Sequence, residues 1–292
     1  MNGIRRVGVL GAGLMGSGIA QVAASCGFDT VVRDVSDAAL ARGRAAVEKS
    51  LAKFVEKGQL LADARDAALQ PMTWSTDVGA IATTDIIIEA VTEDLALKTA
   101  LYRELHPRTA DETIFASNTS SLSIVTLAAA SGRPDRFVGL HFFNPVPLMP
   151  LVEVVRAVTT SEATFVRALA FARGLGKDAV AARDGSGFIV NRLLVPYLLD
   201  AVRSLEQGTG SVADIDRAMM LGCGHPMGPF TLLDFVGLDT TLRIGEIMFD
   251  EYREPRFAPP ALLRRMVAAG WLGRKSGRGF YDYSVNPPVV AM

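Results

Sequence analysis

Short runs of β-branched and other apolar residues alternate with longer helical patterns over the first part of the chain. Strand character is found at 7–10, 30–33, 86–89, 114–116, 137–141, 151–155 and 179–181. Apolar residues recur at helical spacing over 16–25, 38–57, 97–105, 123–130 and 161–175. This alternation predicts an α/β domain of the Rossmann type, with a doubly wound, mainly parallel sheet and helices on both faces.

The pattern changes after about residue 183. From 187 onward no strand is predicted, and helical periodicity runs over 188–206, 211–221, 230–248 and 260–269. We therefore expect two domains, a sheet domain over 1–185 and an all-helical domain over 186–292. The tail over 284–292 is expected to be a loose end, and residues 60–77 match no known motif.

Composition and charge narrow the classes of function. Of the 292 residues, 49% are hydrophobic, and the formal net charge is −1 with both signs evenly mixed. A nucleic acid or an acidic membrane would require a basic patch, so neither is expected as a partner. The two cysteines lie far apart in the sequence, which argues against a disulfide framework. No apolar run is long enough to span a bilayer, and the first predicted strand begins too early to leave room for a leader. We expect a soluble, cytoplasmic protein, and the three histidines lack the spacing of metal ligands.

A glycine-rich loop follows the first predicted strand. Residues 7–16 read VGVLGAGLMG, with the pattern G-x-G-x-x-G at the start of a helix. In that pattern the first glycine permits a tight turn, the second lets a pyrophosphate approach the backbone, and the third lets the helix pack on the strand. The alternative is a glycine turn that binds nothing. The context favours a cofactor site made by Gly11, Ala12, Gly13, Leu14, Met15 and Gly16.

The second predicted strand ends in Asp34, at the distance from the glycine loop that a dinucleotide site requires. A carboxylate at this position accepts hydrogen bonds from the ribose hydroxyls and repels a 2′-phosphate. NAD is therefore favoured over NADP, although the neighbouring Arg33 leaves the second cofactor open.

His141 and Glu153 are candidates for acid–base chemistry. His141 ends an apolar strand, at the edge of the sheet where α/β proteins bind ligands, and Glu153 interrupts the apolar run LVEVV. A carboxylate in such a run needs a partner or a shifted pKa, and a histidine beside it would become a base held in one tautomer. Alternatively, His141 is a satisfied core histidine and Glu153 faces water from an edge strand.

A polar cluster, SNTSSL, follows the strand at 114–116. A hydroxyl at this strand end can bind the oxygen of a substrate. The alternative is that these serines only cap the next helix.

Longer blocks of the sequence carry a family resemblance. The blocks are GAGLMGSGIAQ, FASNTSSLSI, RPDRFVGLHFFNPVPLMPLVEVV, GFIVNRLLVPYLLDAV, DIDRAMMLG, HPMGPFTLLDFVGLDTT and WLGRKSGRGFYDY. Together they resemble the short-chain L-3-hydroxyacyl-CoA dehydrogenases, including the bacterial 3-hydroxybutyryl-CoA dehydrogenases. The similarity extends from about residue 7 to residue 283.

The resemblance implies an N-terminal NAD domain and a helical C-terminal domain that dimerises, with an acyl-CoA held between them. It makes His141 the catalytic base and Glu153 its carboxylate partner. By motif position, the groups that bind substrate oxygens are Ser120 and Asn191. The implied cofactor contacts are Glu93, Lys98, Ser120, Asn144 and Lys275, and the implied coenzyme A contacts are Ser50 and Lys57. A solvated helix face explains Ser50 and Lys57 equally well.

The sequence thus predicts an oxidoreductase that interconverts a short (S)-3-hydroxyacyl-CoA, such as 3-hydroxybutyryl-CoA, and the 3-oxoacyl-CoA with NAD. Such an enzyme would serve fatty acid metabolism by β-oxidation, as a cytoplasmic homodimer. Two alternatives remain open at this point. One is a dehydrogenase of the same architecture that acts on 3-hydroxyadipyl-CoA or on a sugar acid such as L-gulonate. The other is a non-catalytic NAD-binding protein.

Overall fold

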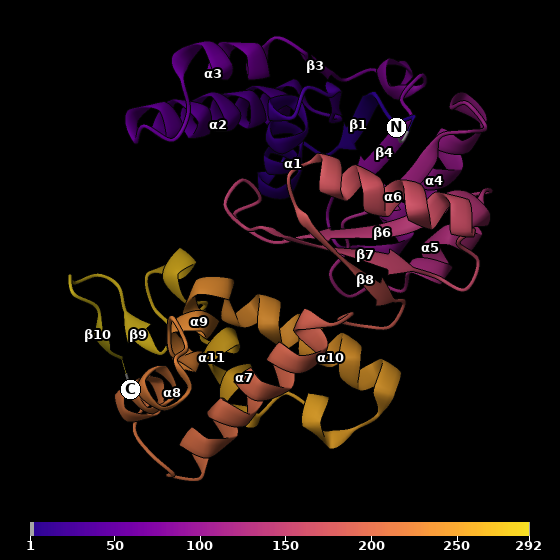
Figure 1. Ribbon diagram of the computed structural model, residues 1–292. Coiled ribbons are helices and arrows are strands. Elements are labelled where there is room, and N and C mark those ends of the chain that lie inside the picture. The colour runs from indigo at the N-terminus through magenta and orange to yellow at the C-terminus, as the bar shows by residue number, and fades with distance from the viewer. Residues whose placement is uncertain (1–2, 292) are drawn as a thin grey trace. The chain divides into compact units, whose positions relative to one another are not determined.

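The computed structural model describes residues 3–291, which form two compact units (Figure 1). The first unit extends to Phe188, and the second begins at Ile189. In the part of the chain that the structure describes, no helix combines the length and the apolar character needed to cross a membrane.

The first unit is built on one eight-stranded sheet with the order β3-β2-β1-β4-β5-β6-β7-β8. Every neighbouring pair is parallel except β6 and β7, which are antiparallel. This topology confirms the predicted doubly wound, mainly parallel α/β fold. The strands are β1 Arg6–Leu10, β2 Asp29–Arg33, β3 Met72–Ser75, β4 Ile86–Glu89, β5 Ile114–Ser117, β6 Phe137–Phe142, β7 Leu151–Arg156 and β8 Asp178–Arg183.

Helices cover both faces of this sheet, because the central strands carry apolar residues on both faces and both must be buried. One apolar core joins the sheet to α1, α2 and α6, and a second core joins the opposite face to α4 and α5. The helices are α1 Leu14–Ser25, α2 Asp37–Glu56, α3 Ala62–Leu69, α4 Leu95–Leu105, α5 Ile124–Ala130 and α6 Glu162–Gly174. Short 3₁₀ turns lie at η1 Val78–Ile81, η2 His106–Arg108 and η3 Pro134–Arg136.

The segment that matched no motif, 60–77, contains α3 and the edge strand β3. Its sequence signal is weak for a physical reason. Only Ala68 of α3 is buried, and the four residues of β3 pair with β2 alone, so few positions need to be apolar.

The second unit is mainly helical and has its own apolar core. Its helices are α7 Val190–Glu206, α8 Val212–Cys223, α9 Pro229–Val236, α10 Leu238–Tyr252 and α11 Ala261–Ala268, with 3₁₀ turns at η4 Pro255–Phe257 and η5 Arg274–Ser276. The single helix predicted over 230–248 is wrong. Gly237 has a φ of 101°, outside the helical range, and divides the segment into α9 and α10.

The prediction of no strand after 187 also needs correction. β9 Tyr281–Asp282 and β10 Val289–Val290 form a small antiparallel pair, so the tail up to residue 291 is not a loose end. Asp234 fixes the start of this ribbon by accepting hydrogen bonds from the N–H groups of Phe280 and Tyr281, both at 2.9 Å.

Candidate active site

The loop after β1 has the geometry that close approach of a ligand requires. Gly11 has a φ of 97°, and a Cβ there would lie 2.8 Å from the carbonyl oxygen of Ala90. A Cβ on Gly16 would lie 1.9 Å from the carbonyl oxygen of Gly11, so only a glycine at this position lets the first turn of α1 pack on the loop. A Cβ on Gly13 would meet nothing within 4 Å. The backbone at Gly13 therefore faces open space at the helix N-terminus, where free N–H groups bind phosphate.

Asp34 lies beside this loop. Its carboxylate accepts hydrogen bonds from the N–H of Ala12 at 2.8 Å and from the N–H of Ser36 at 3.3 Å. Gly11, Gly13 and Asp34 line one pocket, which we call the dinucleotide pocket. The loop and the acid fit a dinucleotide, with pyrophosphate at the glycines and a ribose at the carboxylate.

The antiparallel pairing of β6 and β7 sets His141 directly opposite Glu153. The Nδ1 of His141 lies 2.7 Å from Oε2 of Glu153, and both side chains are buried. The rings of Phe143 and Phe188 pack on the imidazole at centroid distances of 4.5 and 5.6 Å. The structure excludes the alternative left open for Glu153, because its carboxylate is buried against His141 and does not face water.

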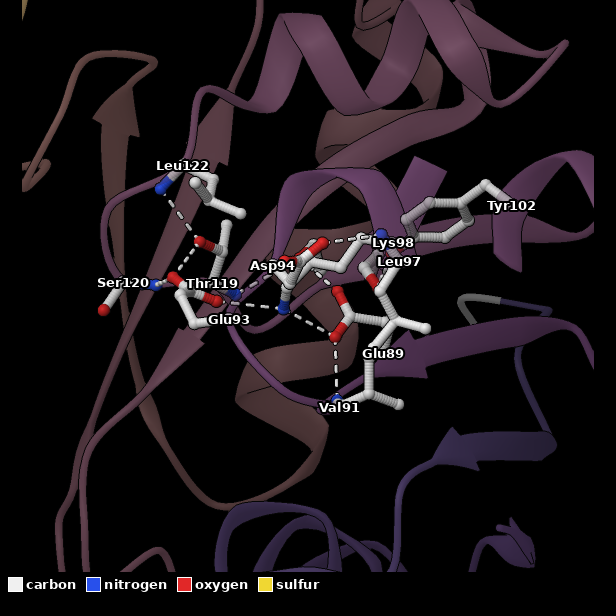
Figure 2. Close-up of polar contacts among 12 residues, drawn as sticks. Glu89, Val91, Glu93, Asp94, Leu97, Lys98, Tyr102, Thr119, Ser120 and Leu122 are labelled. Carbon is white, nitrogen blue, oxygen red and sulfur yellow. Dashed lines mark hydrogen bonds and ion pairs between the residues drawn. The ribbon is translucent and has the colours of Figure 1, made fainter. Parts of the chain in front are cut away.

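The carboxyl end of β4 holds a buried ion-pair cluster (Figure 2). The Lys98 ammonium lies 2.6 Å from Oε1 of Glu89 and 3.0 Å from Oε2 of Glu93. Lys98 is 1% exposed and Glu89 is fully buried. Glu89 also accepts hydrogen bonds from the Val91 N–H at 2.8 Å and from the Ser117 hydroxyl at 2.6 Å, so both of its oxygens are satisfied.

Glu93 connects this cluster to the SNTSSL loop. Its Oε1 accepts hydrogen bonds from the Thr119 hydroxyl, from the N–H of Ser120 at 3.1 Å and from the Ser121 hydroxyl at 3.2 Å. Burial by itself would raise the pKa of Glu93. The positive charge of Lys98, together with these hydrogen bonds, outweighs burial and holds the pKa below its ordinary value. Glu93 is therefore an ionised anchor for the loop.

The SNTSSL loop follows β5 and lies at the same sheet edge as His141. The side-chain oxygen of Asn118 accepts a hydrogen bond from the N–H of Phe142 at 2.9 Å, which ties the loop to the strand that bears His141. Among the described residues, the Ser120 hydroxyl makes no hydrogen bond, whereas Thr119 donates to Glu93 and accepts from the Leu122 N–H. The capping alternative is not observed, because α5 begins at Ile124 and the N–H groups of Ile124 and Val125 donate to Asp184 rather than to a side chain of this loop.

Two further pockets, between α2 and the segment after β6, contain Asn144, Ser50 and Lys57. Asn144 and Ser50 line one pocket with Gly13, which we call the central pocket. Ser50 and Lys57 line a second pocket with Pro145 and Pro147, which we call the outer pocket. The segment that supplies Asn144 is held near α1, because a Cβ on Gly18 would lie 2.9 Å from Cβ of Val146.

The remaining two predicted residues belong to the second unit. Asn191 is in the first turn of α7 and is partly buried. Lys275 is in η5, and its ammonium forms an ion pair with Asp239 at 2.6 Å.

Comparison with known proteins decides the family. Residues 6–185 match the NAD binding domain of 3-hydroxyacyl-CoA dehydrogenase, and residues 187–283 match the C-terminal domain of the same enzyme. The chain belongs to the 3-hydroxyacyl-CoA dehydrogenase family. The predictions of this family, of NAD as the cofactor and of an enzyme are confirmed.

The relatives within this dehydrogenase family cover almost the whole chain. A 3-hydroxybutyryl-CoA dehydrogenase of Mycobacterium tuberculosis is 50% identical over 282 residues, which span 96% of this chain and 99% of that protein. The mitochondrial hydroxyacyl-coenzyme A dehydrogenase of Mus musculus is 48% identical over 287 residues, with 96% and 91% covered. The crystal structure of (S)-3-hydroxybutyryl-CoA dehydrogenase from Ralstonia eutropha has a TM-score of 0.94 and 45% identity, with 97% and 100% covered.

Three residues of this dehydrogenase site escaped the sequence analysis. Glu89 ends the apolar run IIIE, and the argument applied to Glu153, that a carboxylate in an apolar strand needs a partner, would have found it. Asn118 lies inside the recognised polar cluster but was not separated from its neighbours. The local sequence does not mark Phe188, because its contact with His141 forms only when the segment after β8 is placed beside β6 in the folded chain.

A Lys98→Met variant tests the buried cluster. Without the ammonium, the carboxylates of Glu89 and Glu93 repel each other in a buried position, so we expect a loss of about 3–5 kcal/mol of unfolding free energy at pH 7. Repulsion raises the pKa of a carboxylate in the folded state, and such a group stabilises the fold more as the pH falls. The loss should therefore shrink between pH 7 and 5 in urea denaturation, whereas the wild type should gain no stability over this range.

A second variant separates charge from packing in the same measurement. Lys98→Met combined with Glu89→Gln leaves one carboxylate in the cluster and should recover most of the lost stability at pH 7. A Lys98→Met protein as stable as the wild type at neutral pH would contradict the role of Lys98 as the cation that neutralises Glu89 and Glu93.

Proposed function

We propose that the protein interconverts short (S)-3-hydroxyacyl-CoA and 3-oxoacyl-CoA thioesters with NAD and NADH, with 3-hydroxybutyryl-CoA as the best substrate. The observation that carries the proposal is the buried His141–Glu153 pair at the sheet edge that also bears the glycine loop. The relatives named as 3-hydroxybutyryl-CoA dehydrogenases support the choice of a short acyl chain.

His141 moves the proton of the substrate hydroxyl. Its Nδ1 faces the Glu153 carboxylate at 2.7 Å, so the proton of the neutral ring is kept on Nδ1 and the lone pair on Nε2 is available as the base. When His141 takes the proton, the negative charge of Glu153 stabilises the imidazolium. NAD, when bound, supplies the acceptor for the hydride. In the reverse direction the protonated His141 returns the proton to the 3-oxo group.

The other site residues bind and orient. We assign Ser120 and Asn191 to the substrate oxygens, and the unengaged hydroxyl of Ser120 supports this role. We assign Ser50 and Lys57 to coenzyme A, supported by their place in the outer pocket. For the cofactor, the glycine loop and Asp34 bind the adenosine diphosphate half, and the further contacts are Glu93, Lys98, Ser120, Asn144 and Lys275.

We also propose that the second unit forms a homodimer and that the enzyme works in the cytoplasm in fatty acid β-oxidation. Large apolar side chains of this unit are exposed, among them Leu193 at 71%, Leu221 at 75% and Phe235 at 45%. Burying such side chains against a second copy is favourable.

The first test concerns the catalytic pair. With acetoacetyl-CoA and NADH, His141→Ala should lower kcat by about 100- to 10,000-fold, the usual contribution of a general base. Glu153→Gln should also lower kcat sharply and leave KM nearly unchanged, because the carboxylate acts mainly in the transition state. The double variant should be little worse than His141→Ala, because the two residues act as one unit.

Binding of NADH to His141→Ala, followed by fluorescence, is the control for correct folding. Parallel assays with 3-oxoadipyl-CoA, and with L-gulonate and NAD, test the alternative substrates. Near-normal activity of His141→Ala would exclude the mechanism, and turnover of L-gulonate in preference to every thioester would exclude the proposed substrate.

Cofactor choice is tested at Asp34. The carboxylate repels a 2′-phosphate, so Asp34→Ser should narrow the ratio of kcat/KM for NADH over NADPH by about tenfold or more. Its value of kcat with saturating NADH should stay close to that of the wild type. A wild type that uses both cofactors equally well would show that Asp34 does not select between them.

The oligomeric state is tested by multi-angle light scattering at micromolar concentration. We expect twice the mass of the 31.1 kDa chain. Leu193→Glu combined with Leu221→Glu should shift the protein toward the monomer, because a buried unpaired carboxylate is costly. A wild-type monomer would exclude this proposal.

A further inference from the structure

A groove along α2 joins two ligand pockets. The dinucleotide pocket contains Asp34 and Gly11, and the central pocket contains Ser50 and Asn144. One charged side chain lines both pockets, and it is Arg42.

The guanidinium of Arg42 has no protein partner. No hydrogen bond, ion pair or ring contact within residues 3–291 includes it, and the residue is exposed. Its neighbour Arg44, by contrast, donates to Glu48 at 2.9 Å and lines none of the three pockets described above. The nearby carboxylate of Asp34 is already engaged by the N–H groups of Ala12 and Ser36. An arginine that no protein anion neutralises is free to bind an anionic ligand.

Arg42 also begins a basic face of α2. Residues 42, 46, 50, 53 and 57 follow one another at intervals of three or four, so they lie on one side of the helix. Lys53 and Lys57 line the outer pocket together with Ser50. Cations therefore lie at both ends of this face, with Arg42 at the dinucleotide and central pockets and with Lys53 and Lys57 at the outer pocket.

We propose that Arg42 is a shared phosphate-binding residue, which contacts the dinucleotide from one pocket and the phosphates of the coenzyme A moiety from the other. The inference rests on the proposed function, because it requires two phosphate-bearing ligands in adjacent pockets. Such ligands repel each other, and a cation between them lowers that repulsion. The planar guanidinium, with five donors, can serve both at once.

The role predicts a coupling between the two ligands. With Arg42 present, NADH and coenzyme A bind with little mutual hindrance. Without it, each ligand loses a contact and also experiences the uncompensated charge of the other. By linkage, any weakening of NADH binding by coenzyme A must equal the weakening of coenzyme A binding by NADH.

The experiment measures Kd by isothermal calorimetry on Arg42→Gln, for NADH and for free coenzyme A, each with and without a saturating amount of the other. We expect both Kd values to rise by roughly five- to tenfold at low salt, the effect of one charge-assisted hydrogen bond at an exposed site. We further expect coenzyme A to weaken NADH binding more in the variant than in the wild type. The difference between the two proteins should shrink at high salt.

Two variants serve as controls. Arg44→Gln removes the same charge from the same helix outside the pockets, and both Kd values should stay at the wild-type level. Lys57 lines the outer pocket and neither of the other two, so Lys57→Ala should raise the Kd for coenzyme A and leave the Kd for NADH unchanged.

Several outcomes would overturn the inference. An Arg42→Gln protein with both Kd values unchanged, with only one changed, or with the same loss as Arg44→Gln is incompatible with a shared phosphate contact. Failure of the proposed function looks different. In that case the wild type itself binds NADH but neither coenzyme A nor acetoacetyl-CoA, and the second ligand of Arg42 is excluded with it.

Discussion

The buried ammonium of Lys98 is the interaction on which the active edge of the sheet depends. It lies between two carboxylates, one fixed at the end of β4 and the other joined to the loop after β5. Removing these charges from water is costly, and the cost is offset only because each oxygen of Glu89 has a donor. The loop that bears Ser120 is therefore positioned by charge and hydrogen bonds, and its polar side chains remain available for a ligand.

Close packing at glycines shapes the surface on which ligands would lie. A Cβ on Gly43 would come within 2.7 Å of the carbonyl oxygen of Ala12, so α2 rests directly on the glycine loop. The same contact carries the preceding residue, Arg42, to the border of two pockets. On the other side, Gly18 admits the segment that contains Asn144 and Val146. The groove is thus a product of backbone contacts that larger residues would prevent.

The sequence predicts the parts of this molecule that follow from local rules. Alternating periodicity identified seven of the eight main strands, and the glycine spacing predicted the tight loop between β1 and α1. The pairing of His141 with Glu153 also followed, because a buried carboxylate requires a partner. What could not be predicted depends on distant contacts. The edge strand β3 buries too little to be marked, Gly237 interrupts an otherwise regular helical pattern, and the partner of Lys98 is known only when β4 and α4 are placed together.

The antiparallel pairing of β6 and β7 affects how the proposed catalytic pair, His141 and Glu153, responds to local opening of the sheet. His141 and Glu153 are twelve positions apart and belong to neighbouring strands, so their contact closes a short loop at a small cost in chain entropy. The pair lies five strands away from the rim formed by β3, where few apolar residues are buried. Fraying of that rim can proceed while the two side chains stay together. Opening of the other border is different, because β8 pairs directly with the strand that bears Glu153, so loss of β8 would expose that side of the pair to solvent.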